Sequence, residues 1–386
     1  MLRGFLSALA MVAAATFGMG VARAQDLSIA TAGPMTGQYA TFGEQMRRGA
    51  EMAVADINAK GGVMGKKLKL EIGDDACDPK QAVAVANQMV GKKIAFMAGH
   101  FCSSSSIPAS AVYNEAGILQ MTPASTNPKL TDDAAEKNWD NIFRTSGRDD
   151  AQGVVMGGYI AEKFKGKNIA ILHNKSVYGK ALADQVRRAL RELGSSEKMY
   201  ENYTQGDKDF TSLIAKMRQA NIDVMYVGGY HTEAGVLVRQ AREQGLAALL
   251  MSGDALVDNE FWKIAGPAGE GTLMTFASDP RKLATAKDIV AKFKAQNYDP
   301  EGYTLYTYAA IQSWAQAVEK VKSTDTKKVA AELRKMTAKT VIGDLAWNKK
   351  GDLKNPKYNM YKWSMGGNRE IGPIFSPDQF GCCKGE

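Results

Sequence analysis

Strand-like and helix-like segments alternate along most of this chain, and the alternation limits the folds open to it more than any other feature. Short apolar and β-branched runs predict strands at residues 27–32, 68–73, 94–99, 118–122, 168–173, 224–228, 249–252 and 272–277. Amphipathic segments between them predict helices at residues 43–60, 79–92, 151–165, 178–193, 210–220 and 232–244. Alternation of this kind is typical of parallel sheets that carry helices on both faces. The sequence therefore predicts an α/β fold.

The C-terminal part of the chain breaks this pattern. Residues 303–336 contain two helical patterns with no strand between them, and short strands return at residues 345–347 and 358–363. A late return to strand suggests that the chain crosses between domains more than once. Two domains are also expected from the length of 386 residues, which exceeds what one hydrophobic core usually holds.

The N-terminus has the pattern of an export signal. One arginine precedes an apolar run over residues 5–21, and the run ends in Ala22-Arg23-Ala24. A short positive start, a modest apolar core and small residues at the end are typical of a secretory signal peptide rather than of a membrane span. We expect cleavage after Ala24, which leaves a soluble, exported protein.

The charge distribution argues against a nucleic-acid partner. The formal net charge of +8 falls by two when the two arginines of the signal peptide are removed. The remaining basic residues are spread along the chain, with only short pairs such as Arg47-Arg48. Scattered pairs are typical of a solvated surface rather than of a continuous basic patch.

The sequence lacks a recognisable catalytic apparatus. Its three histidines, His100, His173 and His231, lie on separate segments without partners at metal-ligand spacing. The Gly-x-Ser-x-Gly turn of serine hydrolases is absent. Residues 62–67 only superficially resemble a phosphate loop, since Lys67 stands where Ser or Thr is required. We expect no enzyme, no metal site and no cofactor.

Two of the four cysteines are placed to form a disulfide. Cys77 follows one predicted strand and Cys102 follows the next, so both fall at the same edge of a parallel sheet. In an exported protein a bridge between them would close a loop of about 25 residues and stabilise the fold by roughly 3–4 kcal/mol in the loop-entropy model. Cys382 and Cys383 could form a vicinal bridge, pair between molecules or remain free.

Polar side chains gather just after the predicted strands, where open α/β sheets bind ligands. Hydroxyls, small residues, two tyrosines and one acid occur there: Ser103, Ser125, Thr126, Tyr178, Tyr230 and Asp254. Hydroxyls and backbone N–H groups at a helix start suit a carboxylate, and an acid suits an ammonium group. The set predicts a site for a small zwitterion. The simpler alternatives are that the hydroxyls and Asp254 cap helices and that the tyrosines pack at a domain edge.

Five dispersed stretches carry a family likeness: residues 53–62, 74–79, 99–104, 228–231 and 351–354. They read AVADINAKGG, DDACDP, GHFCSS, GGYH and GDLK. Together they resemble the periplasmic leucine/isoleucine/valine-binding proteins of bacterial ABC transporters over essentially the whole mature chain. The resemblance implies a type I periplasmic binding protein fold, with two doubly wound α/β lobes joined by three crossovers. It also implies the disulfide between Cys77 and Cys102.

The same resemblance implies a domain organisation and partners. After a signal peptide, residues 1–24, the N-terminal lobe takes residues 25–146 and 278–355, and the C-terminal lobe takes residues 147–277 and 356–386. A monomer is expected to close on one amino acid in the periplasm and to deliver it to ABC permease and ATPase subunits at the inner membrane.

Family site residues transfer to matching positions of this sequence. Ser103 and Thr126 match positions that bind the ligand carboxylate, together with backbone groups near Ser103 and Ala124. Tyr178 and Tyr230 match second-lobe tyrosines that close over the ligand. The full candidate set is Phe42, Phe101, Ser103, Ala124, Ser125, Thr126, Tyr178, Tyr230 and Asp254.

Two candidate residues depart from the family pattern. Asp254 falls where relatives carry Glu to hold the ammonium group, and Phe42 falls where some carry Tyr at the pocket wall. A shorter acid and a more apolar wall alter the geometry around a buried charge. A branched-chain or related amino acid is therefore the expected ligand, with an amide, urea or aromatic acid as the alternative.

Overall fold

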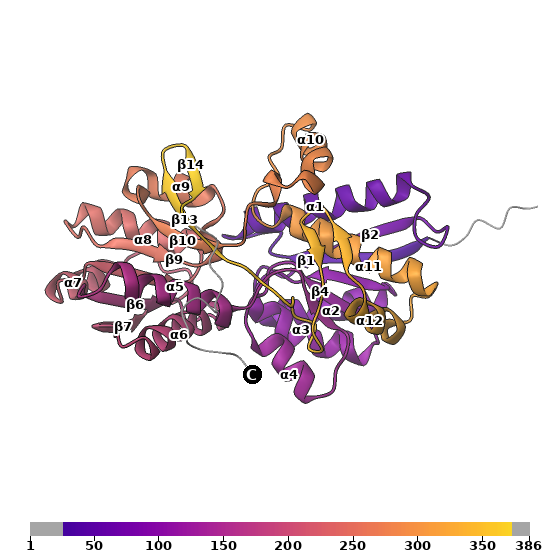
Figure 1. The fold of residues 1–386 in the computed structure, drawn as a ribbon, viewed down its shortest axis with the longest axis horizontal. Helices are drawn as coiled ribbons and strands as arrows, with labels where there is room; N and C mark the ends of the chain where they lie inside the picture. The colour runs from indigo at the N-terminus through magenta and orange to yellow at the C-terminus, as the bar shows by residue number, and fades with distance from the viewer. Residues whose placement is uncertain (1–25, 373–386) are drawn as a thin grey trace, which may run out of the picture.

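The computed structural model describes residues 26–372 and has two α/β lobes that lie side by side (Figure 1). The predicted signal peptide, Cys382 and Cys383 lie outside these residues. In the described range, no helix combines the length and apolar character needed to cross a membrane.

The first lobe is built on a parallel five-stranded sheet with the strand order β2-β1-β3-β4-β5. Its strands are β1 (Leu27–Gly33), β2 (Leu68–Asp74), β3 (Phe96–Gly99), β4 (Leu119–Thr122) and β5 (Ile142–Arg144). The connecting helices are α1 (Ala40–Ala59), α2 (Pro79–Gly91), α3 (Ser103–Glu115) and α4 (Lys129–Glu136). Because all five strands run the same way, their carboxyl ends meet at one edge.

The second lobe contains a seven-stranded sheet with the order β14-β13-β10-β9-β8-β6-β7. Five strands are parallel: β6 (Ile169–His173), β7 (Met199–Asn202), β8 (Val224–Gly228), β9 (Leu249–Ser252) and β10 (Leu273–Phe276). Two antiparallel strands extend the β10 edge: β13 (Asn359–Ser364) and β14 (Gly367–Glu370). The helices are α5 (Asp149–Lys163), α6 (Val177–Glu192), α7 (Thr211–Gln219), α8 (His231–Glu243) and α9 (Glu260–Ala265).

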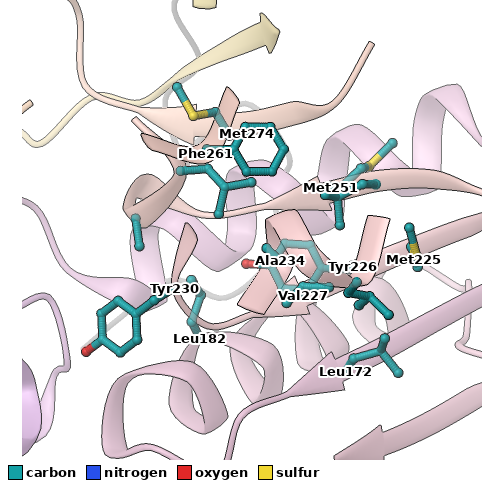
Figure 2. Packing of buried hydrophobic residues seen from close by; sticks show 14 of the residues in the cluster. Leu172, Leu182, Met225, Tyr226, Val227, Tyr230, Ala234, Met251, Phe261 and Met274 are labelled. Atoms are coloured by element: carbon teal, nitrogen blue, oxygen red, sulfur yellow. The ribbon is translucent and has the colours of Figure 1, made fainter. Parts of the chain in front are cut away.

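Apolar side chains from this second sheet and its helices form one buried cluster (Figure 2). Leu172, Tyr226 and Met251 come from neighbouring strands, and Leu182 packs on them from α6. Tyr230 lies at the edge of the labelled group, with its ring turned away from the sheet. The core thus holds the strand ends in place while one tyrosine extends toward the other lobe.

The chain passes between the lobes three times, as the family resemblance implies. The crossings lie between β5 and α5, between β10 and α10, and between β12 and β13. The segment between the last two crossings consists of α10 (Lys287–Ala295), α11 (Thr304–Val321), α12 (Thr326–Lys335), β11 (Ala338–Thr340) and β12 (Gly343–Leu345). It returns to the first lobe, where Trp314 of α11 stacks on Phe96 of β3 at 5.0 Å between ring centroids. We propose the lobe boundaries predicted from the sequence, apart from residues 25 and 373–386, which are not described.

Some element boundaries differ from the predicted ones. Helix α1 begins at Ala40 rather than at Gly43, so Gly43 lies inside the helix and makes a close contact there. A Cβ atom there would lie 2.1 Å from the backbone oxygen of Pro34, so a glycine is required. The strand predicted at residues 345–347 lies two residues earlier, as β12 in a short hairpin with β11.

Candidate functional site

A small hollow lies between the lobes, at the carboxyl ends of both sheets. Its walls are formed by Phe101, Ser103, Ala124, Tyr178, Tyr230, Asp254, Ala255 and Tyr303. Its volume is about 10 Å³, which leaves room for about one water molecule. Six of these residues belong to the predicted ligand set, whereas Ala255 and Tyr303 do not.

The other three predicted residues stand behind the wall. The Phe42 ring stacks on Phe101 at 4.3 Å between centroids. The Ser125 hydroxyl donates to the backbone oxygen of Phe101 at 2.8 Å and also pairs with Ser106. The Thr126 hydroxyl is buried without a hydrogen-bond partner among residues 26–372. Phe42 and Ser125 thus support the wall, while the Thr126 hydroxyl is left unpaired.

The hydroxyl run begins α3 but does not cap it. Cys102 is the N-cap residue, and no side chain in the described chain caps this helix. The Ser103 hydroxyl instead accepts a hydrogen bond from the Asn127 backbone N–H at 3.3 Å. The start of α3 therefore keeps the partial positive charge of a helix N-terminus beside the hollow.

Two glycines place the tyrosines of the second lobe. A Cβ atom at Gly228 would lie 2.1 Å from the Gly179 backbone oxygen, and one at Gly179 would lie 2.4 Å from the Gly228 oxygen. Because both lack a Cβ atom, the start of α6 can pack against the end of β8. This contact brings the Tyr178 and Tyr230 rings to 5.2 Å between centroids.

Asp254 is the buried acid of the hollow. Its Oδ1 accepts from the Tyr178 hydroxyl at 2.7 Å and from Gln152 Nε2 at 3.0 Å, and its Oδ2 accepts from the Tyr303 hydroxyl at 2.6 Å. Burial raises the pKa of the Asp254 carboxyl above its ordinary value, although these three hydrogen bonds oppose the rise. A carboxylate held at a fixed position in a low-dielectric hollow is suited to an ammonium group.

Asp149, at the start of α5, is a second buried acid that the sequence did not single out. Neither of its carboxylate oxygens has a hydrogen-bond partner of ordinary geometry in the described part of the chain. Burial raises its pKa well above the ordinary value, and the charge of Asp254 adds to the rise. Its backbone N–H donates to the Thr126 oxygen at 2.8 Å. The Thr126 hydroxyl also lies beside the Asp149 carboxylate and opposes the rise in its pKa.

Direct contacts hold the lobes closed over the hollow. The Tyr39 hydroxyl of the first lobe donates to Glu233 of the second at 2.7 Å. The Gln45 side chain donates to Asp258 at 2.7 Å. The Asn127 side chain donates to the backbone oxygen of Val177, the first residue of α6. The Phe42 ring meets the His231 ring edge-on at 4.8 Å. These contacts would break if the lobes opened.

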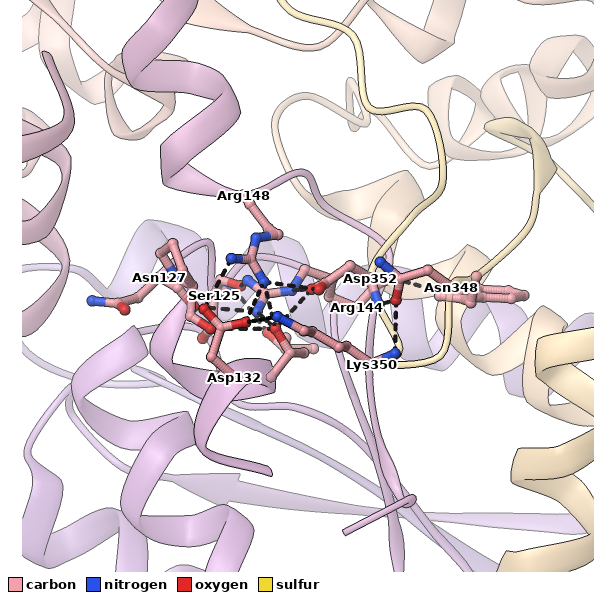
Figure 3. Close-up of polar contacts among 12 residues, drawn as sticks. Ser125, Asn127, Asp132, Arg144, Arg148, Asn348, Lys350 and Asp352 are labelled. Carbon is pink, nitrogen blue, oxygen red and sulfur yellow. Dashed lines mark hydrogen bonds and ion pairs between the residues drawn. The ribbon is translucent and has the colours of Figure 1, made fainter. Parts of the chain in front are cut away.

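A cluster of charges joins the crossings (Figure 3). Arg148, on the first crossing, contacts Asp132 at 3.0 Å and Asp352, near the third crossing, at 2.9 Å. Asp352 also pairs with the fully buried Arg144 at 2.8 Å, and Lys350 reaches Asp132 at 2.8 Å. The Arg144 guanidinium also donates to the backbone oxygen of Ser125, in the segment that follows β4. The cluster therefore links the hinge to the wall of the hollow.

The predicted disulfide between Cys77 and Cys102 is present, with 5.5 Å between the Cα atoms. It ties the turn after β2 to the start of α3. Beside it, buried His100 contacts Asp75 at 2.6 Å and the Tyr113 hydroxyl at 2.9 Å. Within residues 26–372, no group of three or more potential ligand side chains is arranged to hold a metal ion.

Two α/β lobes closed over a hollow at their strand ends define a binding protein of the hinged, two-lobed class. A family model described as periplasmic binding protein matches residues 26–368. An amino acid binding protein of Pseudomonas aeruginosa is 49% identical and covers 92% of this chain and 95% of its own length. A Leu/Ile/Val-binding protein homolog of Brucella suis is 47% identical and covers 97% of this chain and 100% of its own.

A solved structure agrees with this fold. The leucine binding protein LivK of Thermotoga maritima superposes with a TM-score of 0.84 at 24% identity, covering 92% of this chain and 99% of its own. The chain belongs to the periplasmic binding protein family. It is a substrate-binding protein and not an enzyme, and its family membership implies a periplasmic location.

Proposed function

We propose that this protein binds a branched-chain or related amino acid and delivers it to the permease of an ABC transporter. The observation that carries the proposal is the opposed chemistry of the two walls. One lobe offers the start of α3 with the buried Thr126 hydroxyl, and the other offers the buried Asp254 carboxylate. The carboxylate and the ammonium group of an amino acid complement these two walls. The names of the two bacterial relatives support the same ligand class.

Binding would proceed by hinge closure. In an open form the ligand carboxylate would meet Ser103 and Thr126 first. The second lobe would then bring Tyr178, Tyr230 and Asp254 over the ligand and exclude water. The closed form would be the one that the permease recognises. Small-angle scattering that gives the same dimensions with and without saturating ligand would count against this mechanism.

A ligand screen tests the proposal. Residues 25–386 would be unfolded and refolded to remove carried-over ligand, and thermal unfolding would be followed with single amino acids, amides and aromatic acids. A ligand at 100 times its Kd adds ~2.7 kcal/mol to the free energy of unfolding, which raises the Tm by several degrees. Stabilisation by compounds that lack an ammonium group, and not by amino acids, would refute amino-acid binding and favour the aromatic-acid alternative.

The variant Asp254→Asn tests the role of the acid. It keeps the size of the side chain but removes the charge, so we expect the affinity for the best amino acid to fall roughly 10- to 100-fold, as for the loss of a hydrogen bond to a charged group. Isothermal titration would measure the change. The control Asp344→Asn alters an acid that is half exposed on the β11–β12 hairpin and should bind like the wild type. Unchanged affinity in Asp254→Asn would remove Asp254 from the site.

A further inference from the structure

We propose that Tyr303 competes with the ligand for Asp254 and thereby lowers the affinity of the site. The proposal rests on the proposed function, because it takes the ligand group that reaches Asp254 to be an ammonium. Tyr303 was not among the residues predicted from the sequence, since it follows no strand and belongs to the turn before α11.

The argument starts from the hydrogen bonds of Asp254. An ionised carboxylate accepts about four hydrogen bonds. Gln152 and Tyr178, both from the second lobe, occupy Oδ1. The Tyr303 hydroxyl occupies Oδ2 at 2.6 Å. One acceptor position is left on Oδ2, so an arriving ammonium group would have to share this oxygen with the Tyr303 hydroxyl.

Tyr303 reaches Asp254 from the opposite lobe. It directly precedes α11, which packs on the first lobe through the contact of Trp314 with Phe96. Its backbone N–H donates to Oε1 of Gln45 in α1 at 2.9 Å. The hydrogen bond between Tyr303 and Asp254 therefore joins the two lobes and is lost when they separate.

The surroundings hold the phenol in this position. Its ring meets Phe101 and Phe276 edge-on at 4.9 and 5.5 Å between centroids. A Cβ atom at Gly302 would lie 2.3 Å from Gln45 Oε1, so the turn before Tyr303 is packed tightly against α1. These contacts hold the Tyr303 ring beside Asp254 while the lobes are closed.

The size of the hollow supports competition rather than joint binding. A space of about 10 Å³ admits a water molecule but no amino acid beside the Tyr303 hydroxyl. A closed form without ligand lowers the apparent affinity in proportion to its population, since only the remaining open molecules bind. The Tyr303–Asp254 hydrogen bond stabilises that closed form.

The test is the variant Tyr303→Phe, which keeps the ring and removes only the hydroxyl. We expect its Kd for L-leucine, L-valine and L-alanine to fall roughly three- to tenfold relative to the wild type, and the unliganded radius of gyration to rise. A matched control is Tyr308→Phe. Tyr308 also donates to an aspartate, Asp56, at 2.9 Å, but both residues lie within the first lobe. Its affinity and dimensions should match the wild type.

Several outcomes would overturn the proposal. Weaker binding by Tyr303→Phe would mean that the hydroxyl orients Asp254 for the ligand instead of competing with it. Unchanged binding together with an unchanged unliganded radius of gyration would mean that the contact has no energetic role. Damage to folding does not produce tighter binding, so the expected result separates competition from a purely structural effect. If none of the three amino acids binds either the wild type or the variant, the proposed function is refuted. The unliganded radius of gyration of the two proteins would still show whether the Tyr303–Asp254 hydrogen bond stabilises the closed form.

Discussion

At the residue scale, the buried Asp149 carboxyl makes the stability of the protein depend on pH. It is fully buried, and neither carboxylate oxygen has a hydrogen-bond partner of ordinary geometry within residues 26–372. Its pKa is raised well above 3.8, first by burial and then by Asp254, while Thr126 and Arg144 oppose the rise. The folded state therefore holds a proton that the unfolded state releases. The free energy of unfolding must therefore fall as the pH rises from the ordinary carboxyl pKa of 3.8 to the higher pKa of the folded state.

The variant Asp149→Asn should remove this pH dependence. Without ligand, we expect it to be about 1–3 kcal/mol more stable than the wild type at pH 8, because the wild type must either bury a charge or keep a proton that the unfolded chain has released. The difference should shrink toward pH 4, where the wild-type carboxyl keeps its proton in the folded state. Urea unfolding at several pH values measures this. A difference that stays constant from pH 4 to pH 8 would contradict the assignment.

The site could be predicted only where it follows strands. Tyr178, Tyr230 and Asp254 follow the ends of β6, β8 and β9 within a few residues, so their convergence at one edge followed from the sequence pattern. Asp149 sits at the start of α5 beside the first crossing and Tyr303 sits at the start of α11, and no local pattern shows which sheet edge such residues reach. Their roles depend on how the lobes pack, which is a tertiary property.

At the scale of elements, the hinge cluster depends on one carboxylate. Asp352 is buried and pairs with the buried Arg144, so removing it leaves a guanidinium without its charge partner. We expect Asp352→Ala to lower the free energy of unfolding by about 3–5 kcal/mol. Lys350→Ala breaks the exposed ion pair with Asp132 in the same cluster and should cost at most about 1 kcal/mol. Urea denaturation of both variants checks the contrast, and equal losses would refute it.

Elements were predicted well where their patterns were long. The eight predicted strands of the alternating region correspond to β1–β4, β6 and β8–β10, but β5 and β7 were missed. Strand β5 has only three residues, too few to display a pattern. Strand β7 lies at the sheet edge and buries little of its surface, so its residues Met199–Asn202 carry no apolar run. Short strands and edge strands form mainly because they pair with neighbouring strands, and their own residues show little strand preference.

At the scale of the whole molecule, His231 connects lobe closure to pH. Its ring is buried between the lobes against Tyr39 and Phe42, and its nitrogens are unpaired in the described chain. Burial lowers its pKa below 6.5, although the acids around it, Asp258, Glu233 and Glu260, oppose the shift. The closed form therefore favours neutral His231. The closed form is favoured fully at pH values above 6.5, the ordinary pKa of histidine. This preference is lost as the pH falls from 6.5 to the lower pKa of His231 in the closed form.

We expect the unliganded radius of gyration to rise between pH 7 and pH 5 as His231 takes up a proton. The variant His231→Phe keeps a ring against Phe42 and cannot titrate, so its scattering should change less over this range. His173→Phe is the matched control, because His173 lies at the end of β6 with its ring against Tyr200, within one lobe. A variant His231→Phe that opens as much as the wild type would refute the assignment.

The three crossings also decide how the gene for such a protein can be divided. The first sheet ends at β5, yet Trp314, which stacks on Phe96 in that sheet, is encoded far downstream. A fragment that stops at Phe276 would carry all ten parallel strands and still leave the α11 face of the first sheet bare. Neither lobe is a continuous stretch of coding sequence. Exchange of a lobe with a relative therefore requires three junctions, and a nascent chain completes its first lobe only after most of the second has been synthesised.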